Sequence, residues 1–68
     1  MNIDIRQAVK NNLNNSSFED VKSTIVDAMN IKEEKVLPGL GALFEVYWKS
    51  VGEEERNKIV QTITEKIN

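Results

Sequence analysis

The segment Glu33-Glu34-Lys35-Val36-Leu37-Pro38-Gly39-Leu40-Gly41-Ala42-Leu43-Phe44-Glu45-Val46 decides how this chain folds. It holds the only proline and two of the three glycines of the sequence, and it places them against a continuous apolar run. A Pro-Gly step interrupts the preceding structure and favours a turn, while a second glycine lets a bulky segment begin close to another backbone. The segment therefore predicts a packing hinge, which is formed by Leu37, Pro38, Gly39, Leu40, Gly41 and Phe44.

The apolar residues after this Pro-Gly step predict the central helix of the fold. They recur at helical spacing and cover most of the helix circumference: Leu40, Leu43, Phe44, Tyr47, Trp48 and Val51, with Ala42 and Val46 at the flank. Glu45 and Lys49 are four residues apart in the favourable order, which marks a narrow solvent side. We expect Phe44 to be the main core residue. A strand over Leu43 to Trp48 stays open as an alternative, because Phe, Val, Tyr and Trp all suit sheets.

Two helices are predicted before the central one. The first runs from about Asp4 to Leu13, where apolar residues recur at steps of three and four, and the polar run 14–17 ends it. The second begins at this break, where Ser16 and Glu19 have the spacing of a capping box and Ser17 with Asp20 offers an overlapping alternative. Its apolar face consists of Phe18, Val21, Ile25, Ala28 and Met29. The charged residues 31–35 then predict a loop with one helical turn.

A fourth helix is predicted after the central one. Ser50 and Glu53 have the spacing of another capping box, and the acids at 53–55 would occupy the first turn, where the positive end of the helix dipole favours them. Lys66 closes the other end. The expected buried face consists of Ile59, Val60, Ile63 and Ile67. Together these patterns predict an all-α fold, a compact bundle of four short helices with neighbours packed roughly antiparallel, in a single domain spanning residues 1–68.

Composition limits what such a domain can do. A chain of 68 residues buries a modest share of its surface, and without cysteine no disulfide can compensate. Nine basic residues against eleven acidic ones give a net charge of −2, and the basic residues are scattered, so the chain lacks the positive face that phosphate neutralisation needs. Met1-Asn2-Ile3-Asp4 does not resemble a secretory signal, and no apolar run is long enough for a membrane span. We therefore expect a soluble protein inside the cell.

No catalytic, cofactor-binding or metal-binding residue is predicted, and no small-molecule substrate. The sequence has neither histidine nor cysteine, which are the commonest acid-base, nucleophilic and metal-binding side chains. The consecutive acids 53–55 point about 100° apart on a helix and compensate its dipole better than they would hold one ion. Gly39-Leu40-Gly41 lacks the lysine and the preceding strand of a phosphate loop. An enzyme is not expected.

The aromatic residues Phe44, Tyr47 and Trp48 have two interpretations. At these spacings aromatic side chains usually belong to a core, yet a chain this small can hardly bury all three. Tyr47 and Trp48 lie on adjacent sides of the predicted helix, so they are the candidate interface residues. The sequence thus predicts a homo-oligomer, homodimer included, or another protein partner.

The central segment also resembles a known family. Residues 33–48, together with Thr24-Ile25-Val26-Asp27-Ala28 and Arg6-Gln7-Ala8-Val9, are similar to the small acid-soluble spore protein I family of endospore-forming Firmicutes. The resemblance implies synthesis in the forespore during sporulation, residence in the spore core, no cofactor and no defined biochemical activity. Ile31-Lys32 departs from it, because a glycine-like break would be more comfortable there. The motifs of the DNA-coating α/β-type spore proteins are not found.

A second resemblance keeps nucleic acid in view as an alternative. Two N-terminal helices followed by residues 35–46 are similar to the bacterial histone-like fold, in which a Gly-x-Gly turn opens a strand that ends in Phe-Glu-Val. This resemblance implies an architectural DNA-binding protein. However, the basic arm that such proteins insert into the minor groove is replaced here by the acids after Ser50.

Overall fold

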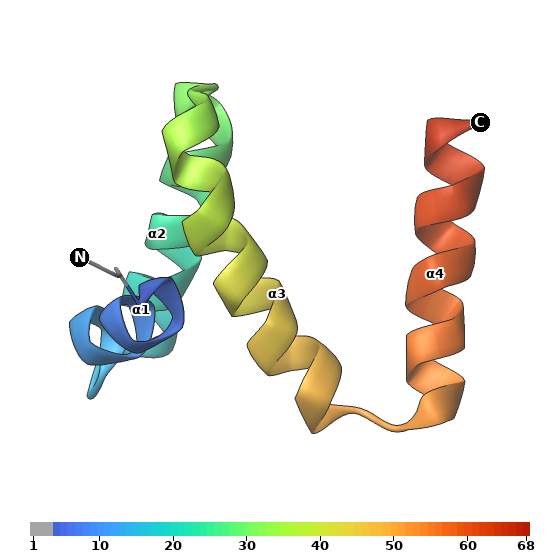
Figure 1. Cartoon of the computed structure of the whole chain (residues 1–68), viewed down its shortest axis with the longest axis horizontal. Coiled ribbons are helices and arrows are strands. Elements are labelled where there is room, and N and C mark those ends of the chain that lie inside the picture. Colours follow the sequence, from blue (N-terminus) through green and yellow to red (C-terminus); the bar gives the residue numbers. More distant parts are fainter. Residues whose placement is uncertain (1–3) are drawn as a thin grey trace.

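The computed structural model describes residues 4–68 and is helical throughout its regular elements (Figure 1). The helices are α1 (Ile5–Leu13), α2 (Phe18–Ile31), the short 3₁₀ turn η1 (Glu34–Val36), α3 (Leu37–Ser50) and α4 (Glu53–Ile67). Within residues 4–68 no strand forms, so the all-α prediction is confirmed and the strand considered for Leu43 to Trp48 is excluded. Met1 to Ile3, on which the expectation about a secretory signal partly rests, lie outside the described residues.

The first two helices begin and end where short polar side chains satisfy the backbone. At α1 the Asp4 side chain accepts a hydrogen bond from the Gln7 amide at 3.1 Å. Of the two capping boxes predicted for α2, the second one forms: the Asp20 amide donates to Ser17 Oγ at 3.1 Å, and the Ser17 amide donates to Asp20 Oδ2 at 3.4 Å. Lys32, which ends α2, adopts the left-handed conformation with φ 58°. This conformation favours glycine, and a glycine-like break is expected from the sequence at this position.

The prediction of a Pro-Gly turn before the central helix is wrong. Pro38 lies in the first turn of α3, which already begins at Leu37. The proline ring fixes φ near the helical value, and its missing N–H would have no partner in a first helical turn anyway, so this residue starts the helix. Gly39 and Gly41 continue it without positive φ, and a Cβ atom at either position would meet no atom within 4 Å. The close backbone approach predicted for Gly41 is therefore absent.

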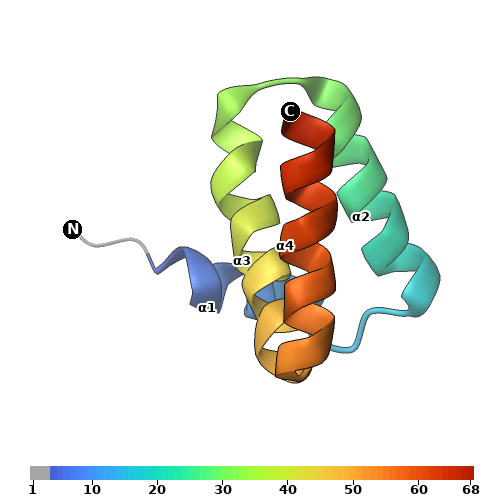
Figure 2. The ribbon, with the colours of Figure 1, turned by 90° about the vertical axis from the view of Figure 1, so that its right-hand side faces the viewer.

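The central position of α3 is confirmed for the N-terminal part of the fold. The tertiary contacts of α3 are with α1 above all, and also with α2 and η1. After Ser50 the chain turns, and α4 runs back in roughly the opposite direction but stands apart from the other helices (Figures 1 and 2). The radius of gyration is 13.5 Å, compared with about 11 Å for a compact domain of this length. The four helices thus form a more open arrangement than the compact bundle expected.

Burial is concentrated at one point of the molecule. Among the described residues Ala42 is the only buried apolar side chain, and it lies where α1 meets α3, although the sequence placed it at the flank of its helix. Phe44, the predicted main core residue, is 42% exposed. The expected buried face of α4 is also largely open: Ile59 is half-buried, while Val60, Ile63 and Ile67 are exposed. A small alanine permits the close approach of two helices, but one such crossing buries little apolar surface.

Because Gly41 is helical and surrounded by open space, Gly41→Ala is expected to raise the free energy of unfolding by about 0.5–1 kcal/mol. Thermal unfolding followed by circular dichroism measures this change. Gly52→Ala is the control. Gly52 is the N-cap of α4 and has extended backbone, so alanine at this position is not expected to raise the free energy of unfolding. A lower melting temperature for Gly41→Ala would contradict the open environment of this glycine.

Candidate interaction surface

Trp48 anchors α4 to α3 at the corner between the two helices. The Arg56 guanidinium carbon lies 5.6 Å from the centre of the Trp48 ring, and Arg56 Nε donates a 2.8 Å hydrogen bond to the Trp48 backbone carbonyl. The rings of Phe44 and Trp48, one helical turn apart, lie 5.8 Å from centre to centre at an interplanar angle of 42°. Trp48 is half-buried by these contacts. A cation above an indole face is favourable, so this contact orients the start of α4.

Sequence reasoning missed the role of Arg56. The available signal was an arginine eight residues after a tryptophan, across a break in the helical pattern. The capping box predicted from Ser50 and Glu53 is wrong, because the Ser50 hydroxyl donates instead to the Tyr47 carbonyl at 2.7 Å and closes the end of α3. Gly52 is the N-cap of α4 and offers no side-chain hydrogen bond. The acids 53–55 do occupy the first turn of α4, as predicted.

Tyr47, the second predicted interface residue, is 43% exposed. Its hydroxyl donates a long hydrogen bond of 3.4 Å to Glu55 Oε1, which leaves much of the ring open. The inner side of the same corner is a groove of about 350 Å³, with Phe44 on the α3 side and Ile59 and Ile63 on the α4 side. We call the four residues Ile59, Val60, Ile63 and Ile67 the α4 apolar face. This face continues from the groove toward the end of α4.

Apart from Phe44, the predicted hinge residues lie at the opposite end of α3 from this corner. Leu37 and Pro38 are exposed in its first turn, and Gly41 is exposed one turn later. Gly39 and Leu40 are half-buried and border a cavity of about 330 Å³ between the first three helices. The other residues that line this cavity are Val9, Asn12, Leu13, Thr24, Ala28, Val36 and Leu43. The structure therefore divides the predicted hinge residues: Phe44 lies at the corner with Tyr47 and Trp48, and the other five lie away from it.

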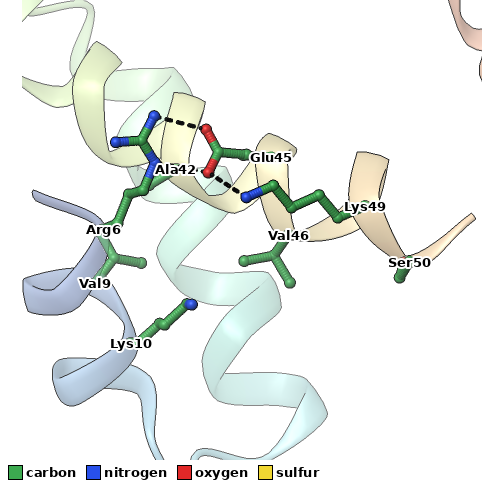
Figure 3. A pocket seen from close by; sticks show the side chains of 8 residues that line it. All are labelled: Arg6, Val9, Lys10, Ala42, Glu45, Val46, Lys49 and Ser50. Carbon is green, nitrogen blue, oxygen red and sulfur yellow. Dashed lines mark hydrogen bonds and ion pairs between the residues drawn. The ribbon is translucent and has the colours of Figure 1, made fainter.

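An ion-pair network joins α1 to α3 beside Ala42 (Figure 3). Arg6 donates two hydrogen bonds to the Glu45 carboxylate, at 2.6 and 2.9 Å, and Lys49 Nζ lies 3.3 Å from Glu45 Oε1. The hydrogen bond from Arg6, followed by that from Lys49, lowers the pKa of Glu45 to about 2. The same contact raises the pKa of Arg6. The Glu45–Lys49 pair was predicted, whereas Arg6 comes from 39 residues away and no spacing rule indicates it.

Neither a metal centre nor a membrane span is evident in the described part of the chain. Residues 4–68 contain no group of three or more acidic, histidine or cysteine side chains placed to hold a metal ion. None of the helices described is both long and apolar enough to cross a membrane.

A family profile described as "Small, acid-soluble spore protein I" matches residues 3–67. The chain belongs to this family. A small acid-soluble spore protein I of Shouchella clausii is 46% identical over 68 residues, covering 100% of this chain and 99% of the relative. The protein of that name from Halalkalibacterium halodurans is 46% identical over 65 residues, or 96% of each chain, and that from Bacillus subtilis is 44% identical over 63 residues, or 93% of this chain and 89% of the relative.

No solved structure matches this small acid-soluble spore protein. Membership of the family confirms the resemblance found in the central segment and associates the chain with sporulation. The matched residues include all of α1, α2, α3 and α4, so the relationship covers both the anchored helices and the open one.

Phe44→Ala tests how much the aromatic contact contributes to this spore protein. Because the ring is only partly covered, by Trp48 among others, we expect a loss of about 1–2 kcal/mol in the free energy of unfolding, well below the 3–5 kcal/mol usual for a fully buried phenylalanine. Urea unfolding of the wild type and the variant gives the difference. A loss near the larger value would mean that Phe44 is covered in solution by something beyond the single chain.

The Glu45 network predicts a specific pH dependence. Its folded pKa of about 2 lies below the ordinary value of 4.5, so the stabilising contribution is complete above about pH 4.5 and is lost as the pH falls toward 2. Glu45→Gln removes the titrating group. The melting temperatures of the wild type and this variant should therefore differ at neutral pH and converge near pH 2; a difference that persists unchanged in acid would contradict the assignment.

Proposed function

We propose that this family member is a non-enzymatic protein of the spore core, made in the forespore during sporulation, that works by binding protein, including further copies of itself. Its membership of the small acid-soluble spore protein I family supports the association with sporulation. The binding role is supported by the apolar surface that a single chain leaves uncovered. Tyr47 would contribute to this surface directly, and Trp48 would contribute the part of its ring that Arg56 leaves free.

The observation that carries the binding role is the exposure of large apolar side chains at the α3–α4 corner and along α4. Phe44 and Tyr47 are exposed on α3, and three of the four residues of the α4 apolar face are exposed as well. Single exposed apolar residues are ordinary, but an extended row of them on one helix usually marks an interaction surface. Covering this row would remove apolar area from water, which favours association.

The titratable groups fit a structural role better than a catalytic one. Glu45 is the carboxylate whose pKa is clearly shifted, and its ion pairs hold it charged instead of tuning it toward neutral pH. The sequence offers no histidine or cysteine to complete an acid-base or nucleophilic pair with it. Arg6 therefore serves to tie α1 to α3 through Glu45, while Lys49 pairs with the same carboxylate from within α3.

No observation favours the architectural DNA-binding alternative. The histone-like resemblance implied a strand ending in Phe44-Glu45-Val46, whereas these residues lie in the middle of α3. The residues at 53–55, where a basic arm would be needed, are acidic and form the first turn of a helix.

Two measurements test the proposed function. Immunolocalisation in sporulating cells should place the protein in the forespore and later in the spore core; signal confined to the mother cell or the coat would contradict this. The purified protein should leave duplex DNA unretarded in a gel at about 50 mM salt. Retardation that weakens as salt is raised would instead support the architectural alternative.

A further inference from the structure

We propose that α4 pairs with α4 of a second copy of this chain in antiparallel orientation, through the α4 apolar face. This inference rests on the proposed function and names the partner for one part of the surface. It follows from three features of α4: its isolation from the other helices, the spacing of its apolar residues, and the distribution of its charges.

The isolation of α4 leaves room for a partner helix. Arg56 ties its first turns to Trp48, but the helix then runs beside the groove without packing closely on α1 or α2 (Figures 1 and 2). Exposure increases along the helix, from half-buried Ile59 to Ile67, which is 78% exposed. The part of α4 farthest from its anchor is thus the part that most lacks a neighbour.

The apolar residues of α4 have the spacing of a two-helix seam. Val60, Ile63 and Ile67 are separated by steps of three and four, so they form one stripe along the helix, with Ile59 at its edge. Such a stripe can pack against a copy of itself. In an antiparallel pair centred between Val60 and Ile63, each Val60 lies opposite the partner's Ile63, so the same contact occurs twice in the dimer.

The charges of α4 select the antiparallel orientation. Glu55 in the first turn and Lys66 in the last are eleven residues apart, which is about three helical turns, so they lie on one line beside the apolar stripe. With Val60 opposite Ile63, Glu55 of one copy comes close to Lys66 of the other, and the twofold symmetry repeats this pair. A parallel arrangement would instead place the acids at 53–55 of both copies side by side, where like charges repel.

The helix dipoles point to the same orientation. In the antiparallel pair the positive N-terminal end of each α4 lies beside the negative C-terminal end of the other. The second copy is therefore a partner whose shape and charge both match α4, because the surface is complementary to itself. It would cover Val60 and Ile63, the exposed centre of the stripe, which the other three helices of the single chain leave open.

Sedimentation equilibrium of the full chain tests this pairing. The wild type is expected to be a dimer. Ile63→Gln should weaken dimerisation by on the order of tenfold or more, because it places a polar group at the centre of the seam. Val26→Gln is the matched control, since Val26 is an exposed aliphatic residue on α2, away from α4. It should leave the dimer dissociation constant unchanged.

Charge reversal tests the orientation. Lys66→Glu and Glu55→Lys should each weaken the dimer by roughly threefold to tenfold at low salt, and the double variant should return to within about threefold of the wild type. Lys22→Glu, at an exposed lysine of α2, controls for the change in net charge that Lys66→Glu makes. Circular dichroism confirms for every variant that the helices persist.

Each outcome decides the inference. Weakening by Ile63→Gln together with rescue in the double charge variant supports it. A dimer that neither Ile63→Gln nor Lys66→Glu weakens overturns the α4 pairing, while protein binding through another surface survives. Weakening by Ile63→Gln without charge rescue overturns the antiparallel orientation. A monomer up to about 1 mM overturns the pairing and self-association together, whereas the forespore location and the absence of DNA binding are decided separately.

Discussion

The crossing of α1 over α3 at Ala42 is the contact on which the rest of the structure depends. The small alanine lets the two helices approach, and the Arg6–Glu45 ion pair fixes the crossing from one side. Around it, Leu40 and Leu43 contribute half-buried surface to the cavity shared with α1 and α2. α3 contacts every other element of the N-terminal part. The position of α4 is set by α3, through the short turn after Ser50 and the contact between Trp48 and Arg56.

This arrangement buries little apolar surface for a folded chain of 68 residues. Small domains usually compensate with disulfides, bound metal or association, and this sequence has no cysteine for the first. Association through the exposed apolar side chains of α3 and α4 would supply the missing burial. The function proposed for this member of the small acid-soluble spore protein I family and the physical requirement of its fold thus point to the same surface.

The sequence predicted the helices well because their signals are local. Apolar spacing located all four helices. Of the two alternative capping boxes predicted for α2, the Ser17–Asp20 box forms. The errors arose where one residue type has two uses. Pro38 can end one element or start the next, and Ser50 can cap the following helix or close its own. Periodicity also shows which face of α4 is apolar, but it does not show whether that face meets a neighbour.

The candidate surface was predictable only in part for the same reason. Tyr47 and Trp48 could be selected from the sequence because a small domain can hardly bury three aromatic residues of one helix. Their contacts with Glu55 and Arg56 could not be predicted, because these contacts join α3 to α4. Arg6 and Glu45 are 39 residues apart, so their pairing depends on the crossing itself.

The most direct test of the central claim is the melting temperature as a function of protein concentration. If a second copy completes the fold, the melting temperature rises with concentration; a melting temperature that stays constant, with a monomeric mass throughout, would contradict the account.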